Sequence, residues 1–260
     1  MGRNAKGQPS MSDFNRGYAR PVPQTADMSV DAGLRAFMLG VYNKMALGLV
    51  LSGALAYLTS SVEPVRDLLF RTTPTGALAG YTALGWIVAF APLAILLFGG
   101  FSRREPNPRT AGIMYWTIVS LIGASLGAIF LLYTGGSIAS TFFITAASFG
   151  ALSLFGYSTK RDMSGWGSFL IMGVVGLIIA GVVNIFLKSP ALYFAINGLG
   201  VLIFAGLTAY DTQRLKMTYY QLGGDENALG VATNYGALSL YLDFINLFQF
   251  LLAFMGARRD

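Results

Sequence analysis

The sequence contains no cysteine and no histidine, and it has few charged residues of either sign. Without cysteine the chain has no disulfide, no thiolate nucleophile and no cysteine-based metal site. Without histidine it lacks the commonest general base and metal ligand and the simplest pH switch. Charged residues make up 12% of the 260 positions, about half the share in soluble domains. Any proton chemistry therefore depends on a small number of carboxylates.

Hydrophobic residues make up 54% of the chain and gather in long runs. Runs longer than about 18 apolar residues indicate membrane-spanning helices. We therefore predict an all-α membrane protein, a seven-transmembrane-helix bundle in contact with the lipid bilayer. The expected spans are about Phe37–Ser60, Gly76–Phe98, Thr110–Tyr133, Ser137–Tyr157, Trp166–Leu187, Ala191–Gln213 and Ala232–Gly256.

The hydropathy pattern divides the chain into three regions. Residues 1–35 are polar and predict a disordered cytoplasmic tail, residues 36–257 form the transmembrane domain, and residues 258–260 form a short C-terminal tail. With a cytoplasmic N-terminus, the inner segments hold twelve Lys and Arg residues and the outer ones five, as the positive-inside rule requires. Arg258 and Arg259 would then lie outside, so a six-span or re-entrant arrangement stays open. The net charge of +6 reflects this topology, and no nucleic-acid partner is expected.

The last apolar segment carries Asp243 in its middle. A carboxylate at that depth costs about 2.5–3.5 kcal/mol on insertion scales, so it should face protein or water. Ser239, Asp243 and Asn246 share one helical face. This polar seam predicts that the seventh helix is central and enclosed by the other helices. The alternative is a buried polar contact that only fixes helix packing.

Asp211 is the other acidic residue inside the expected spans. On the sixth helix it shares a face with Asn197 and Thr208. Two carboxylates that meet in a poorly solvated site would share a proton, titrate as a pair and act as a switch near neutral pH. Their oxygens also suit transient binding of Ca²⁺. The sequence leaves open whether the two acids touch or whether Asp211 is simply solvated. Lys44 in the first span is a candidate basic partner, with snorkelling to the interface as the default interpretation.

Small residues predict close helix contacts in two places. Gly76 with Gly80, and Gly123 with Gly127, have the GxxxG spacing that lets backbones approach in lipid. We favour packing inside the bundle over a dimer interface. The sequence shows no phosphate-binding loop and no nucleophile elbow, so we predict no enzyme activity, no catalytic residue and no cofactor.

Several motifs resemble those of the Bax inhibitor-1 family, whose members are also called transmembrane Bax inhibitor motif proteins. The resemblance covers about residues 31–256 and is typical of a bacterial member in the inner (cell) membrane. The matching stretches are FGYSTKRD at 155–162 with SGWGS at 164–168, SIASTFFITAA at 137–147, GLTAYDTQ at 206–213, ALSLYLDFINLF at 237–248 and YNKMALG at 42–48.

The resemblance implies a seven-helix fold with a central seventh helix, and an aspartyl dyad of Asp211 and Asp243. It implies a pH-sensitive Ca²⁺ leak across the membrane, with calcium as the transported ion. Some bacterial members instead bind and restrain a membrane-anchored quality-control protease, which is the alternative function. In some members a basic residue of the second span closes on the dyad as a latch. Here no Lys or Arg precedes Arg103 in that region, and Lys44 would be a substitute.

Overall fold

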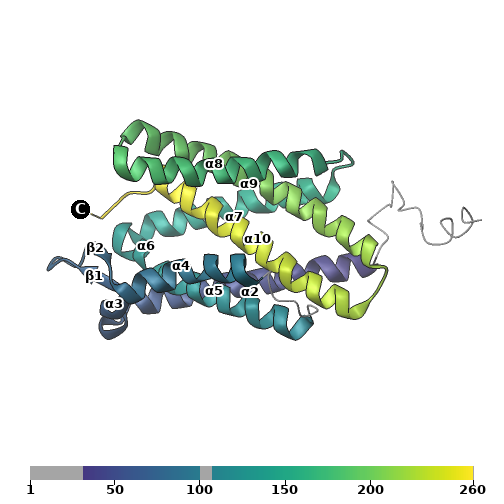
Figure 1. The fold of residues 1–260 in the computed structure, drawn as a ribbon, viewed down its shortest axis with the longest axis horizontal. Helices are drawn as coiled ribbons and strands as arrows, with labels where there is room; N and C mark the ends of the chain where they lie inside the picture. Colours follow the sequence, from purple (N-terminus) through teal and green to yellow (C-terminus); the bar gives the residue numbers. More distant parts are fainter. Residues whose placement is uncertain (1–31, 100–106, 260) are drawn as a thin grey trace, which may run out of the picture.

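The computed structural model describes residues 32–99 and 107–259. In these residues the chain forms an elongated bundle of helices with a small hairpin at one end (Figure 1). The elements are α2 (Ala32–Ser61), α3 (Glu63–Leu69), β1 (Phe70–Thr72), β2 (Leu78–Tyr81), α4 (Ala83–Gly99), α5 (Pro108–Ser125), α6 (Gly127–Leu132), α7 (Gly135–Ser158), α8 (Ser164–Leu187), α9 (Pro190–Leu222) and α10 (Glu226–Met255).

Six stretches are long and apolar enough to cross a membrane: α2, α5 continued by α6, α7, α8, α9 and α10. The chain is thus a helical multi-pass membrane protein. Helix α4 is shorter, with 17 residues and Pro92 inside it. At about 1.5 Å per residue it is about 26 Å long, slightly less than the hydrocarbon core of about 30 Å.

The expected second span differs most from the structure. We predicted a helix from about Gly76, but residues 78–81 form β2, which pairs antiparallel with β1, and the helix begins only at Ala83. Gly76 lies in the turn of this hairpin with φ 81°, a conformation that suits glycine. The expected GxxxG contact of Gly76 and Gly80 is therefore wrong, because neither residue is helical.

The second glycine pair packs inside the bundle, as predicted. A methyl group on Gly123 of α5 would lie 2.6 Å from the Cα of Ser52 on α2. One on Gly127, at the start of α6, would lie 2.2 Å from the hydroxyl of Thr59. The two glycines thus allow the α5–α6 stretch to approach α2 closely, which is how small residues act in membrane helices.

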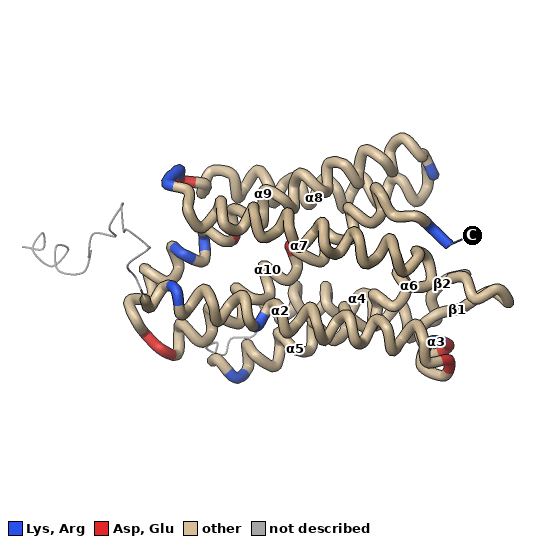
Figure 2. The backbone as a smooth tube through the Cα atoms, turned by 180° about the vertical axis from the view of Figure 1, so that it is seen from behind, with Lys and Arg blue, Asp and Glu red and all other residues tan. Residues whose placement is uncertain are grey.

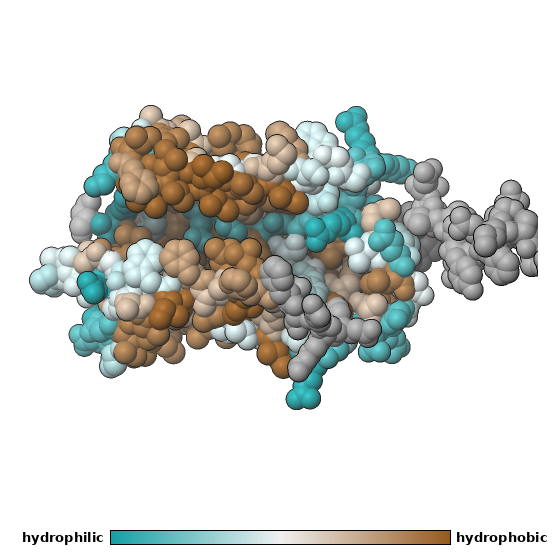
Figure 3. All heavy atoms as spheres, in the orientation of Figure 1, coloured by the Kyte–Doolittle hydropathy of each residue, from teal (hydrophilic) through white to brown (hydrophobic). Residues whose placement is uncertain are grey.

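Helix α10 crosses the bundle diagonally and contacts α9, α2, α5 and α7 (Figure 1). Half of its most apolar stretch is buried, a larger share than in the other long apolar helices. Helix α8 packs mainly on α9 and has the smallest buried share. On the face that Figure 3 shows, apolar side chains cover α8, while hydrophilic residues gather toward the two ends. The burial of α10 follows from its position between four neighbours.

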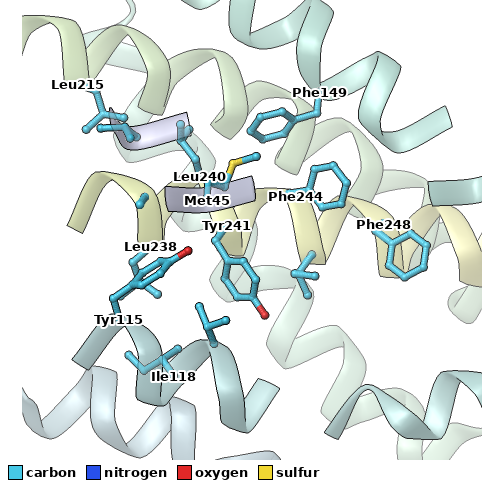
Figure 4. Packing of buried hydrophobic residues seen from close by; sticks show 14 of the residues in the cluster. Met45, Tyr115, Ile118, Phe149, Leu215, Leu238, Leu240, Tyr241, Phe244 and Phe248 are labelled. Carbon is cyan, nitrogen blue, oxygen red and sulfur yellow. The ribbon is translucent and has the colours of Figure 1, made fainter. Parts of the chain in front are cut away.

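The main core surrounds α10. Tyr241 and Phe244 of α10 meet Tyr115 and Ile118 of α5 on one side and Phe149 of α7 on the other (Figure 4). Phe248 of α10 is buried as well and packs edge-on against Phe142 of α7.

The two ends of the bundle carry different connections (Figures 1 and 2). The end where α2 begins also holds the α7–α8 and α9–α10 connections, and the hairpin and the chain's last residues lie at the other end. Helix α2 begins at Ala32, so residues 32–35, which we assigned to the tail, are helical. Residues 1–31 of the expected tail lie outside the described residues. At the C-terminus, the backbone of Arg259 donates to Leu132 O at 2.9 Å and fixes the last residues against the end of α6.

Local hydrogen bonds define where the helices near the site begin. Asp225 caps α10 by accepting from the backbone N–H of Ala228 at 3.0 Å. In the α7–α8 connection, Asp162 accepts from the N–H of Ser164 at 2.8 Å. This hydrogen bond lowers the pKa of the Asp162 carboxyl, so that it is ionised at neutral pH at the start of α8. These exposed carboxylates serve the helix ends, which leaves Asp211 and Asp243 as the acids inside the bundle.

Candidate functional site

Asp211 lies on α9 where that helix packs against α10. Its side chain is buried, and it accepts a hydrogen bond from the hydroxyl of Ser239 on α10. Its other oxygen lies 3.5 Å from a guanidinium nitrogen of Arg214, one helical turn later on the same helix. Arg214 is half-exposed, so it can reach the solvated end of the bundle. Asp211 is therefore a buried carboxyl with one hydroxyl partner and one basic partner.

Asp243 lies in the middle of α10 and is also buried. Its Oδ2 atom is enclosed and has no hydrogen-bond partner among the described residues. A buried carboxylate oxygen without a partner is costly, because it has lost its hydration without gaining a hydrogen bond. Such a group is stable when it carries a proton or when a cation neutralises it. Asp243 therefore has the environment of a proton- or cation-binding side chain.

Ser239 joins α10 to Asp211. It precedes Asp243 by one helical turn on α10 and donates to Asp211 on α9. No direct hydrogen bond joins the two carboxyl groups in the part of the chain that the structure describes. The geometry is two buried acids on helices that pack together, of which Asp211 has a hydroxyl partner on the other helix.

Next to Asp211 in sequence, a set of hydrogen-bonded hydroxyl groups joins α9 to α7 and α2. The hydroxyl of Thr212, the residue after Asp211, is 3.0 Å from the hydroxyl of Ser153 on α7. Ser153 also bonds the hydroxyl of Tyr42 on α2. The sequence reasoning missed Thr212, Ser153 and Tyr42. The signal that could have found them is the run of small polar residues at one-turn spacing on α9.

Gln213 fixes the loop beside these hydroxyl groups. Its amide donates to the carbonyl of Arg161 at 2.7 Å, and its carbonyl accepts from the N–H of Met163 at 2.8 Å. Both partners belong to the α7–α8 connection. Three consecutive residues, 211 to 213, thus contact α10, α7 and the α7–α8 loop. The α9 segment that carries Asp211 is held from three sides.

Lys44, the candidate basic partner, bonds a residue other than the two acids in this structure. Its ammonium group donates to the side chain of Asn234 on α10 and lies 5.8 Å from the ring centre of Tyr115. Asn234 in turn donates to the carbonyl of Pro108 at the start of α5 at 3.2 Å. Lys44 therefore connects α2 to α10 and α5, and Arg214 is the basic neighbour of the acids. Helix α4 has no Lys or Arg.

The other predicted seam residues have local partners. Asn246 and Thr208 bond carbonyls of their own helices, Leu242 O and Phe204 O, at 2.8 Å each. Asn197 does the same with Tyr193 O. It lies fourteen residues from Asp211, which is about 21 Å along a helix. Of the four supporting residues, Ser239 alone bonds one of the two acids, and Asn197 belongs to the far end of α9.

The described residues contain no group of three or more His, Cys, Asp or Glu that could hold a metal. Ca²⁺ takes six to eight oxygen ligands, more than the two buried carboxyl groups and the Ser239 hydroxyl supply.

A family model described as "Inhibitor of apoptosis-promoting Bax1" matches residues 34–260. An uncharacterised protein of Caulobacter vibrioides is 70% identical over 96% of this chain and 100% of its own length. The uncharacterised protein RP147 of Rickettsia prowazekii is 48% identical over 94% of this chain and 99% of its own length. Inner membrane protein YbhL of Escherichia coli is 42% identical over 88% of this chain and 94% of its own length.

Proposed function

Because the chain belongs to the Bax inhibitor-1 family, we propose that it is a pH-sensitive leak pathway for Ca²⁺, gated by Asp211 and Asp243. The observation that carries this proposal is the buried Oδ2 of Asp243, which has no partner among the described residues. It lies beside a second buried acid that a neighbouring helix holds through Ser239. The pair can bind a proton or a cation, and exchange between the two is the basis of a pH-dependent gate.

The gate follows from electrostatics. With one proton on the pair, a single negative charge remains, which the Ser239 hydroxyl stabilises by a hydrogen bond and the half-exposed Arg214 partly neutralises. With both acids ionised, two negative charges lie in a poorly solvated site and repel each other. This repulsion loosens the contact between α9 and α10 and attracts cations. The protein acts on ions without chemical conversion, so the proposal requires no catalytic residue.

Ca²⁺ flux into liposomes that contain only the purified protein tests this function. We expect an influx above that of protein-free liposomes, with its steepest change between about pH 6 and 8, where a shared carboxyl proton is released. Liposomes with the heat-denatured protein serve as control. Absence of flux from folded protein at every pH would overturn the leak function. It would favour the alternative, a protein that binds a membrane-anchored protease.

We also propose that all seven apolar helices cross the inner membrane, with α10 central, α4 as the second span and the N-terminus in the cytoplasm. The two ends of the described chain lie at opposite ends of the bundle (Figure 1). The end where α2 begins carries Lys160 and Arg161 between α7 and α8, and Arg214 and Lys216 near the end of α9. This placement agrees with the positive-inside rule, and the name of YbhL supports the inner membrane.

Reporter fusions at the two termini test this topology. A reporter that is active only in the cytoplasm should give a signal at the N-terminus and none at the C-terminus, and a periplasmic reporter should give the reverse. A fusion after Lys160, in the α7–α8 connection, is the internal control and should match the N-terminus. Cytoplasmic signals at both termini would rule out the seven-span arrangement and leave α4 as a helix that does not cross.

A further inference from the structure

We propose that a groove between α2 and α7 binds an anionic phospholipid, with the phosphate at Arg35 and one acyl chain along the groove. This site goes beyond the proposed ion pathway and does not depend on it. The groove has a volume of about 660 Å³, within the range of about 300–1,000 Å³ that is typical of small-molecule sites. Both helices pack on α10, on either side of it (Figure 2), and the groove lies between them.

The floor of the groove is apolar and closed by the core. Met38, Met45 and Phe149 line it and are buried. Figure 4 shows the side chains of Met45 and Phe149 converging beside Phe244 of α10. The rims are exposed, with half of Leu39 and two thirds of Leu154 accessible. The floor is buried, the apolar rims are open, and both helices span the membrane. Such a hollow faces the acyl chains of the lipid.

The length of the groove fits one leaflet. On α2 it extends from Arg35 to Ala46, eleven residues or about 16 Å. Half of the hydrocarbon core is about 15 Å. Arg35, exposed in the first turn of α2, therefore stands at headgroup depth when Ala46 lies near the middle of the bilayer. An acyl chain that follows the groove places its phosphate beside the Arg35 guanidinium.

Charge selects an anionic lipid over a neutral one. Arg35 is the charged residue among those that line the groove. A second basic group bonds the lining of the groove: the ammonium of Lys216 on α9 donates to the backbone carbonyl of Tyr157 at 3.2 Å, and Tyr157 lines the groove. Basic groups between transmembrane helices on the cytoplasmic side are the feature that binds anionic headgroups. A hydrophobic helix of a partner protein would leave Arg35 without a counter-charge.

The groove also contacts a pair of hydrogen-bonded hydroxyl groups. Tyr42 and Ser153 line it, and their hydroxyl groups bond each other between α2 and α7. Ser153 also bonds Thr212, the neighbour of Asp211 in sequence. An acyl chain in the groove therefore packs against the Tyr42–Ser153 hydrogen bond and excludes water from it.

Native mass spectrometry of the purified protein tests this site. Protein released from nanodiscs of equal parts phosphatidylglycerol and phosphatidylcholine should retain one phosphatidylglycerol molecule. Arg35→Gln should lower the preference for phosphatidylglycerol about fivefold, the factor for one basic side chain at the membrane surface. Arg109→Gln, at the start of α5 and outside the groove, is the matched control and should retain the lipid.

A second variant tests the site by filling the groove with a side chain. Gly150 lines it and has open space where a side chain would begin, so Gly150→Leu should displace the acyl chain and leave a folded protein. Gly53→Leu, on α2 with open space and outside the groove, is its control. Equal retention of both lipids by the wild type, or full retention by Gly150→Leu, would overturn the proposal. A wild-type dimer that Gly150→Leu converts to monomer would assign the groove to a second copy of the chain and overturn it as well.

Discussion

Asp243→Asn is expected to remove most of the pH dependence of Ca²⁺ flux between about pH 6 and 8, the range in which a shared carboxyl proton is released. Asparagine has nearly the shape of aspartate but cannot exchange a proton. In the wild type, a gate that follows one proton can change flux by up to about tenfold per pH unit, since one unit corresponds to about 1.4 kcal/mol. In the variant the ratio of flux at the two pH values should fall close to one.

Asp211→Asn should have a similar effect, because in the proposed gate the two buried acids of the packed helices α9 and α10 share one proton. The double variant should then add little to either single change. Arg214→Gln should keep a pH dependence, because it leaves both acids in place, but should shift its midpoint by removing the charge 3.5 Å from Asp211. These results require reconstituted protein and the same Ca²⁺ influx assay across pH.

The control for this series is Asp225→Asn. Asp225 caps α10 outside the buried region, and asparagine caps a helix about as well as aspartate. Its flux profile should match the wild type. Wild-type pH profiles in folded Asp211→Asn and Asp243→Asn proteins would exclude the pair as the gate. The protein-partner function would then be the better explanation of the buried acids.

Gly156→Ala is expected to destabilise the protein by about 2 kcal/mol or more, the range for overpacked interiors. A methyl group at Gly156 on α7 would lie 2.2 Å from the carbonyl oxygen of Ala209 on α9 and 2.9 Å from its Cα. These are backbone atoms, so relief requires the two helices to separate. The contact lies two residues before Asp211 and next to the Ser153–Thr212 bond. The variant should therefore disturb the site as well as the fold.

Gly150→Ala on the same helix is the matched control. The space around it is open, and alanine favours a helix over glycine by up to about 1 kcal/mol. Gly150→Ala should thus be neutral or stabilising, opposite in sign to Gly156→Ala. Thermal unfolding in detergent, followed by circular dichroism, compares the two variants. Equal melting temperatures for both would show that α7 and α9 do not require a glycine at their crossing.

The sequence alone determined the class of the protein and its two unusual acids. Long apolar runs specify membrane helices because a bilayer requires about 20 apolar residues and internal backbone hydrogen bonds. Asp211 and Asp243 are recognisable without coordinates, because a carboxylate inside such a run is costly and has to be enclosed. The spacing of Ser239 and Asp243 indicated a central last helix, since residues one turn apart share a face.

The tertiary structure alone decided which groups meet. A shift of one residue moves a side chain about 1.5 Å along a helix and about 100° around it, so hydropathy cannot assign partners between helices. For this reason the sequence did not show that Lys44 bonds Asn234, or that Arg214 lies beside Asp211. The β1–β2 hairpin was missed because the apolar residues of β2 resemble the start of a membrane span. The groove at Arg35 likewise forms because α2 and α7 both pack on α10 with a hollow between them, and the sequence of one helix alone does not show it.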